Sequence, residues 1–82
     1  MNAEKYVGII MRDDTEKFVR ETPKIYEPNR IVREYEFDDG AIVTYEWRDT
    51  SFGDFNHQFT LIQAPNKNPD KLKPGIIKTI RY

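Results

Sequence analysis

The clearest pattern in the chain is an alternation of apolar and charged residues on both sides of a short polar turn. Residues 31–37 read IVREYEF and residues 41–47 read AIVTYEW. β-branched and aromatic residues that recur with a period of two are typical of strands that bury one face. The residues between the two segments, Asp38, Asp39 and Gly40, are typical of turns. The pattern therefore predicts a β-hairpin.

The register of this hairpin depends on the length of its turn. A two-residue turn at Asp39 and Gly40 would mix aromatic residues with glutamates on one face. A three-residue turn, with Gly40 in the left-handed conformation that its missing Cβ permits, keeps the aromatic residues together. We therefore expect the pairs Phe37–Ala41, Tyr35–Val43, Arg33–Tyr45 and Ile31–Trp47. One face then collects Ile31, Tyr35, Phe37, Val43, Tyr45 and Trp47, and the other collects Val32, Glu34, Glu36, Ile42, Thr44 and Glu46.

Three further segments have the composition of strands. Residues 5–12, 54–64 and 75–82 are rich in β-branched and aromatic residues. The side chains expected to share a face are Val7, Ile9 and Met11 in the first, Phe55, His57, Phe59 and Leu61 in the second, and Ile76, Ile80 and Tyr82 in the third. Both ends of the chain are therefore expected to lie in the sheet.

Residues 13–29 are compatible with two structures. Asp13 with a glutamate three residues later is a helix-start pattern, and the next proline would end a short helix near residues 14–22. Such a helix would offer few apolar side chains to a core. The alternative, which we favour, is a turn followed by a short strand over residues 17–21 that returns along residues 5–12.

These elements predict a mainly β protein with a single small domain over residues 1–82. We expect a small, curved antiparallel sheet of five or six strands, barrel-like or sandwich-like, with the short helix near residues 14–22 as the alternative for that segment. A chain this short buries little apolar surface. We therefore expect Trp47 to be among the largest contributors to stability, with Trp47→Ala costing about 3 to 5 kcal/mol.

The composition limits the classes of protein to which the chain can belong. Phe, Tyr and Trp make up 13% of the 82 residues, which is too many for a disordered chain. The absence of cysteine excludes disulfides, thiolate metal sites and cysteine nucleophiles. No run of apolar residues approaches the roughly 18 that a membrane span needs, and no secretory signal is visible. We expect a cytoplasmic protein without membrane contact and without a metal or cofactor.

Charge is distributed unevenly along the chain, although the formal net charge is −1. Residues 1–54 hold 13 acidic and 8 basic residues, whereas residues 55–82 hold one acidic and five basic residues. The expected acidic face of the hairpin consists of Glu34, Glu36 and Glu46, flanked by Asp38 and Asp39. The basic residues of the second part are Lys67, Lys71, Lys73, Lys78 and Arg81. Each pole is a candidate surface for a partner of opposite charge.

The sequence contains no evident catalytic motif, so the leading hypothesis is a non-enzymatic binding module of the accessory or inhibitor type. Such a module would dock a protein partner through the acidic hairpin face or through a sheet edge. The second hypothesis is a small nucleic-acid-binding β-barrel that uses the lysine-rich segment 67–81. Pairing of two copies through an edge strand is left open.

His57 is the only histidine and is the basis of a third hypothesis, a small hydrolase or ribonuclease-like enzyme. Such a site needs a base, an acid and a cation for the phosphate. The residues available to join His57 are Glu34 or Glu46 and Arg33 or Arg48. The phase of His57 with the aromatic residues of its segment instead favours a packing position at the edge of the apolar face, with one ring nitrogen hydrogen-bonded. We therefore predict no catalytic residue and no enzyme.

Overall fold

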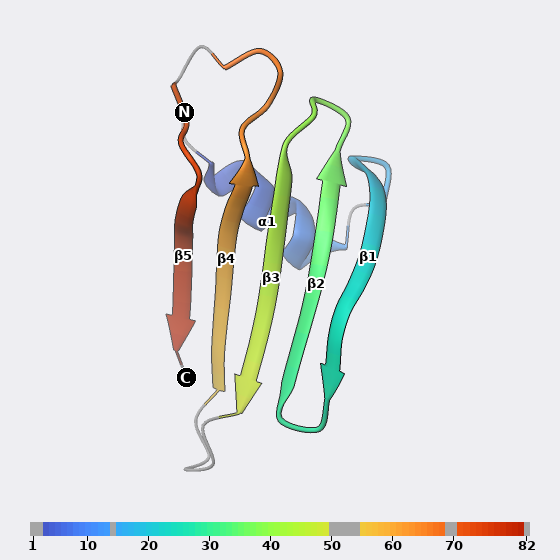
Figure 1. Cartoon of the computed structure of the whole chain (residues 1–82), viewed down its shortest axis with the longest axis vertical. Coiled ribbons are helices and arrows are strands. Elements are labelled where there is room, and N and C mark those ends of the chain that lie inside the picture. The colour runs from blue at the N-terminus through green and yellow to red at the C-terminus, as the bar shows by residue number, and fades with distance from the viewer. Residues whose placement is uncertain (1–2, 14, 50–54, 69–70, 82) are drawn as a thin grey trace.

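The strands form one antiparallel sheet in which each strand pairs with its neighbours in sequence (Figure 1). The computed structural model describes residues 3–13, 15–49, 55–68 and 71–81. The elements are, in chain order, α1 (Glu4–Arg12), β1 (Phe18–Glu27), β2 (Arg30–Phe37), β3 (Ile42–Asp49), β4 (Phe55–Gln63) and β5 (Gly75–Arg81). The prediction of a mainly β protein with five or six antiparallel strands is confirmed with five strands. The order β1-β2-β3-β4-β5 leaves the sheet open, so the barrel-like alternative is wrong.

The hairpin of β2 and β3 has the predicted register. Its pairs include Tyr35–Val43, Arg33–Tyr45 and Ile31–Trp47. The turn is closed by hydrogen bonds from Phe37 N to Ala41 O at 2.8 Å and from Gly40 N to Phe37 O at 3.0 Å. Gly40 has a φ of 90°, which a residue with a Cβ rarely adopts. The Asp39 carboxylate accepts a hydrogen bond from Ala41 N at 2.9 Å, which fixes the turn further.

The first segment is a helix, α1, and not the predicted strand. Its buried side chains are Tyr6, Val7 and Ile10, at the three-residue and four-residue spacing of one helix face. Met11, which the strand pattern placed in the core, is 59% exposed. Asp13 ends the helix in a left-handed conformation, so it is a C-cap and does not start a second helix. The strand prediction for residues 5–12 is therefore wrong.

β1 is a strand, as we favoured for part of residues 13–29, but it is longer and has a different partner. It pairs with β2, because residues 5–12 are helical, and it continues through Pro23. Proline is compatible with this position because β1 is an edge strand, and two register shifts interrupt its pairing. The alternative of a helix near residues 14–22 is wrong.

β4 carries the predicted apolar face. Phe59 is 1% exposed and Leu61 is 2% exposed. Ile80 of β5 packs against the same core, as predicted. The side chains of Phe55 and Tyr82, which we predicted to face the core, lie outside the described residues.

A bulge in β5 changes the side of the sheet toward which Ile76 points. Phe59 pairs with Lys78 and Thr60 pairs with Ile76, so Ile77 is an extra residue on β5. Ile77 packs against the core as a result, while Ile76 is 65% exposed. The prediction that Ile76 shares a face with Ile80 is wrong, because a strict alternation along the strand does not allow for an inserted residue.

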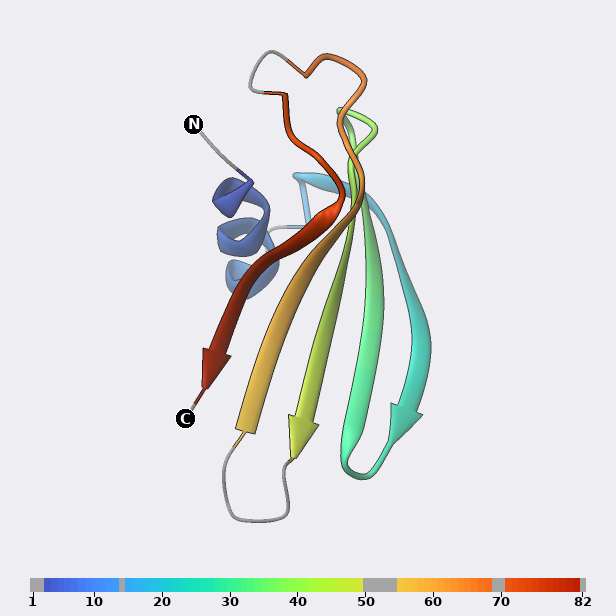
Figure 2. The ribbon, with the colours of Figure 1, turned by 60° about the vertical axis from the view of Figure 1, so that its left-hand side comes forward.

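α1 packs on one side of the curved sheet, which we call the helix face (Figure 2). The buried core between them consists of Ala3, Tyr6, Val7, Ile10, Tyr35, Phe37, Ala41, Val43, Phe59 and Leu61. The Tyr6 ring lies 4.6 Å from the ring of Phe37, and its hydroxyl donates a hydrogen bond of 2.7 Å to the Asp39 carboxylate. Burial and the Asp39 carboxylate raise the pKa of Tyr6. This bond ties α1 to the hairpin turn.

Trp47 does not belong to this core. It lies on the helix face, as the register predicted, but it is only half-buried and is not among the side chains packed against the core. The structure therefore does not support our expectation that Trp47 is among the largest contributors to stability. The difference arises because the alternation of the strand identifies a face but not the extent of the layer that covers it.

Candidate functional site: a groove on the helix face

α1 covers only part of the helix face. A helix of nine residues spans about 13 Å. The longest strand has ten residues and spans about 33 Å, and the shortest strands of the hairpin have eight. The strands therefore extend past the helix (Figure 2). Beyond α1, the side chains of the helix face are only half-buried.

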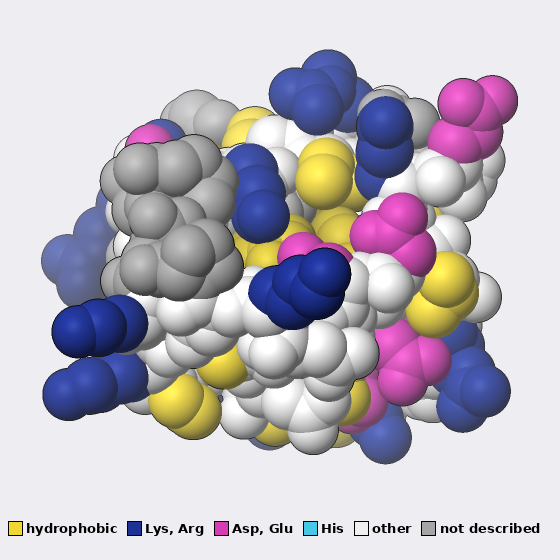
Figure 3. Space-filling model, turned by 90° about the horizontal axis from the view of Figure 1, so that it is seen from above, with side chains coloured by type: hydrophobic (Ala, Val, Ile, Leu, Met, Phe, Trp, Pro, Cys, Tyr) yellow, Lys and Arg dark blue, Asp and Glu magenta, His cyan; other side chains and the backbone are white. Residues whose placement is uncertain are grey.

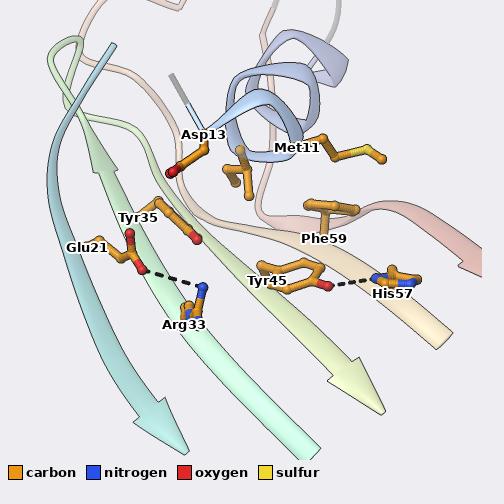
Figure 4. Close-up of a pocket in the computed structure, with 9 residues that line it drawn as sticks. Met11, Asp13, Glu21, Arg33, Tyr35, Tyr45, His57 and Phe59 are labelled. Atoms are coloured by element: carbon orange, nitrogen blue, oxygen red, sulfur yellow. Dashed lines mark hydrogen bonds and ion pairs between the residues drawn. The ribbon is translucent and has the colours of Figure 1, made fainter. Parts of the chain in front are cut away.

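Two adjoining hollows on this side form what we call the helix-face groove. The larger hollow lies beside the C-terminal end of α1 and has a volume of about 370 Å³ (Figure 4). It is lined by Ile10, Met11, Asp13, Glu21, Arg33, Tyr35, Tyr45, His57 and Phe59. The smaller hollow, of about 270 Å³, is lined by Ile31, Arg33, Tyr45 and Trp47. Arg33 and Tyr45 line both hollows, so the groove is continuous.

A row of polar side chains crosses the floor of the groove, one from each of four successive strands. Glu21 comes from β1, Arg33 from β2, Tyr45 from β3 and His57 from β4 (Figure 4). The guanidinium of Arg33 lies 3.7 Å from the Glu21 carboxylate. The Tyr45 hydroxyl and the Nδ1 atom of His57 are 2.6 Å apart. The row therefore consists of two interacting pairs whose positions follow from the strand register.

The charges in the row are fixed by their surroundings. A hydrogen bond with Tyr35 and the nearby Glu21 carboxylate raise the pKa of Arg33, although partial burial opposes them. Burial raises the pKa of the Tyr35 hydroxyl, and the carboxylates of Glu21 and Asp13 add to this effect, while Arg33 opposes it. Arg33 is therefore charged and Tyr35 is neutral over the ordinary pH range. With two carboxylates and one guanidinium, the formal charge of these lining residues is negative.

Aromatic rings hold the middle of the groove in place. The Tyr45 ring lies 5.1 Å from the Phe59 ring and stacks on the His57 ring at 5.8 Å. The Phe18 ring meets the Tyr35 ring edge-on at 5.1 Å. These contacts are within the range of favourable aromatic pairs, so the exposed faces of the rings are presented in fixed orientations. The floor of the groove is therefore formed before any ligand binds.

His57 occupies the position that the sequence predicts for it. It lies at the edge of the apolar face, half-buried, with a ring nitrogen hydrogen-bonded to Tyr45. The enzyme constellation considered for it is not assembled. Glu34 and Glu46 lie on the opposite face of the sheet, and Arg48 pairs with Glu46 there.

The carboxylate that does share a face with His57 is Glu21, which the sequence analysis did not single out. Three strand spacings separate β1 from β4, or about 14 Å between backbones. A general acid and a general base must both reach the same reacting group. Glu21 and His57 stand at opposite ends of the row, so they do not flank one small reacting group.

The predicted acidic face of the hairpin is largely compensated by neighbouring cations. Glu46 accepts hydrogen bonds from Arg30 at 2.5 Å and from Arg48 at 3.0 Å. Burial alone would raise the pKa of Glu46, but these two arginines lower it below its usual value. Glu34 lies 3.3 Å from the ammonium of Lys24. These two carboxylates are therefore already paired.

The remaining acidic residues predicted for this surface have other surroundings than Glu34 and Glu46. The Asp39 carboxylate binds the Tyr6 hydroxyl and lies 3.8 Å from the Lys5 ammonium, so its role is structural. Glu36 is half-buried and Asp38 is exposed. A partner-binding role for this face stays a prediction.

The basic residues of the segment 55–82 differ from the acidic residues of the hairpin in their surroundings. Lys67, Lys71, Lys73, Lys78 and Arg81 are all exposed. Within the described part of the chain, none of the five forms an ion pair. Blue side chains project from the left-hand side of Figure 3, the side on which β5 lies in Figure 1. Lys78 and Arg81 lie on β5, Lys71 and Lys73 lie in the connection that leads into it, and Lys67 follows Asn66, whose amide binds Asp39 O at the hairpin turn. The residues on and before β5 form a second candidate surface.

Comparisons with known proteins add no family. Neither the family models, nor the curated proteins, nor the solved structures contain a match to this chain. Over the described residues, there is no helix of the length and apolar character needed to cross a membrane. The same residues contain no cluster of three or more histidine, aspartate or glutamate side chains suited to a metal ion.

Proposed function

We propose that this chain is a non-enzymatic protein-binding domain and that the helix-face groove receives an extended segment of its partner. The observation that carries the proposal is the set of residue types in the groove. Tyrosine, tryptophan, arginine and methionine are the residues enriched at the centres of protein interfaces, and Tyr45, Trp47, Arg33 and Met11 line this groove. The cytoplasmic location expected from the sequence stays a prediction.

The position of Trp47 supports a docking role more than a folding role. A tryptophan is costly to leave in contact with water, and here it lies beyond the reach of α1. Covering a large apolar side chain contributes about 1.5 to 3 kcal/mol. Trp47 and Tyr45 are already half-buried, so a segment that covered their remaining surface would gain a fraction of this amount from each, before the loss of its own freedom is counted.

The charge of the groove favours a polypeptide over a nucleic acid. Asp13 and Glu21 line it together with a single arginine, so a phosphate backbone would meet more negative than positive charge. A polypeptide can satisfy both signs, because its amides donate to the carboxylates and its carbonyls accept from Arg33. The mixed polar row and the aromatic floor thus suit a neutral or weakly basic segment.

The experiment is a selection of peptides from a displayed random library with the folded chain as bait. We expect Trp47→Ala and Arg33→Ala each to weaken binding of the selected peptides by about tenfold or more. The control is Ile62→Ala, because Ile62 is 48% exposed and does not line the groove. Peptides that bind both groove variants as tightly as the unchanged chain would refute the proposal.

A further inference from the structure

The two edges of the sheet differ in how open they are to another strand. β1 contains Pro23, which cannot donate a hydrogen bond to a neighbour, and register shifts interrupt its pairing twice. β5 contains no proline, and it pairs regularly with β4 from Lys78 to Arg81. In the part of the chain that the structure describes, no strand lies on the far side of β5. β5 is therefore the edge that can accept a further strand.

The charge of β5 and of the connection before it is mainly positive. β5 contains Lys78 and Arg81 and no acidic residue, and the connection contains Lys67, Lys71 and Lys73 against one acid, Asp70. Glu46 of β3 lines the same hollow as Arg81 but already binds Arg30 and Arg48. Carboxylates on the rest of the sheet, among them Glu34 and Glu46, have cations of their own within 3.3 Å. The cations at β5 have no such partner among the described residues. The β5 edge thus offers main-chain hydrogen-bonding groups and positive charges to a partner.

We propose that the β5 edge binds an extended, acidic segment of a partner protein as a sixth strand of the sheet. The main chain of the segment exchanges hydrogen bonds with the outward-facing groups of β5, which fixes its geometry. Lys78 pairs with the inward-facing Phe59 and Arg81 follows three residues later, so the two cations lie on opposite faces of the sheet. A segment with a carboxylate on each face satisfies both, which selects an acidic sequence. Ile76, 65% exposed, offers an apolar contact at the start of the strand.

Charge argues against a second copy of this chain as the occupant. Two β5 strands paired with each other would place two positive charges beside two others with no acidic residue between them, and like charges across a strand pair are destabilising. A single-stranded nucleic acid fits less well than a polypeptide. Binding of that kind uses aromatic side chains on which bases stack, and residues 67–81 contain none.

This surface is separate from the helix-face groove. None of the residues of β5 lines either hollow of the groove. Strand addition at β5 therefore does not depend on the proposed function of the groove, and Trp47→Ala leaves it unchanged. A failure of one proposal is distinguishable from a failure of the other by which substitutions alter binding.

The test uses three fluorescent peptides of the length of β5, seven residues. The first has two glutamates three positions apart among valines, so that their side chains face opposite sides of the strand as those of Lys78 and Arg81 do. The second has lysine in place of glutamate, and the third is the first with alternate backbone nitrogens methylated. Anisotropy titrations with the whole chain, at low and at physiological salt, give the affinities. We expect binding of the first peptide only, because the second lacks the charge and the third lacks the main-chain donors.

The matched variants reverse the same number of charges at opposite edges. Lys78→Glu with Arg81→Glu is expected to lower the affinity for the acidic peptide by about tenfold or more at low salt. Lys17→Glu with Arg20→Glu, at the β1 side, is expected to change affinity by less than about twofold. If the first double variant does not fold, as judged by its thermal melting curve, Lys78→Gln with Arg81→Gln replaces it and is expected to weaken binding about threefold.

Amide chemical shifts complete the test, because strand addition perturbs residues 76–81 and leaves the groove unperturbed. Equal affinity for the methylated peptide would overturn the proposal, since the contact would not be a strand. Displacement of the peptide by a short single-stranded oligonucleotide at lower concentration would overturn it in favour of nucleic acid. Self-association of the unchanged chain, abolished by the charge reversal at β5, would overturn it in favour of a second copy.

Discussion

The same three strands have different surroundings at their two ends. Where α1 covers β2, β3 and β4, the inward side chains Tyr35, Phe37, Val43, Phe59 and Leu61 are at most 4% exposed. Where the helix has ended, Ile31, Arg33, Tyr45, Trp47 and His57 are only half-buried. The alternation along the strands is the same in both regions. A pattern with a period of two thus identifies a face, whereas the length of the covering element decides which part of that face is core.

The largest expected effect lies in the covered region. Phe59→Ala removes a ring that is 1% exposed and leaves a cavity between α1 and the sheet, so we expect a loss of about 3 to 5 kcal/mol in the free energy of unfolding. Urea denaturation followed by tryptophan fluorescence measures it. A loss below about 1 kcal/mol would mean that α1 does not pack on the sheet as described.

The next effect concerns the bond that holds α1 over the hairpin. Tyr6→Phe removes the hydroxyl that donates to the Asp39 carboxylate, and we expect a loss of about 1.5 to 2 kcal/mol. Because the folded state raises the pKa of Tyr6, its contribution is complete below the unfolded value near 10 and is lost as the pH rises through the higher folded value. The unchanged chain should therefore lose more stability above pH 10 than Tyr6→Phe does. If the free energy of unfolding fell equally with pH in both proteins above pH 10, the hydrogen bond between Tyr6 and Asp39 would be contradicted.

Trp47→Ala is the direct test of the comparison, because Trp47 has the alternation of a core residue but is only half-buried. We now expect a loss of about 1 to 1.5 kcal/mol, well below that of Phe59→Ala. Urea denaturation monitored by circular dichroism measures it, since the fluorescent residue is gone. A loss above about 3 kcal/mol would place Trp47 in the core and remove the uncovered region from consideration as a docking site.

The smallest effect lies on the outer face. The pKa of Glu46 is lowered in the folded state, so its pairing with Arg30 and Arg48 stabilises the fold above the unfolded pKa near 4.3 and is lost as the pH falls through the folded value. Glu46→Gln should cost about 0.5 to 1 kcal/mol at neutral pH and should flatten the fall in stability on acidification. An identical acid transition in both proteins would show that the pairing contributes nothing.

The parts of the fold that the sequence predicts well are those fixed by neighbours in the chain. The hairpin register follows from one turn, because Gly40 permits a conformation that places the whole aromatic set on one face. The same register places Arg33 opposite Tyr45 and puts Trp47 on their face, so the sequence predicts that part of the groove. The pairing of Trp47 with His57 depends on the register of β3 and β4, which the sequence did not predict. The groove itself exists because α1 ends before the strands do, and no local sequence pattern predicts that position.

The errors have physical causes that the pattern alone does not contain. In a segment as short as residues 5–12, Val7, Ile9 and Met11 fit a strand, while Val7 and Ile10 fit a helix face equally well. Only the sheet on which the segment packs decides between them. Glu21 was missed as a groove residue for a related reason.

Strand β1 was expected to pair with this first segment, and its true pairing with β2 brings Glu21 opposite Tyr35. The bulge at Ile77 likewise depends on pairing with β4 and leaves no mark in the alternation.

The position of α1 before the sheet in the chain has a consequence for biosynthesis. The helix is made before the sheet, yet the surface that it covers includes Phe59 and Leu61, which the ribosome adds roughly fifty residues later. A nine-residue helix is marginal in water without such a surface. The sheet grows one neighbouring strand at a time, so each strand can pair as it emerges. α1 therefore cannot pack until β4 has been made, and until then the nascent chain carries an apolar sheet face that a chaperone can reach.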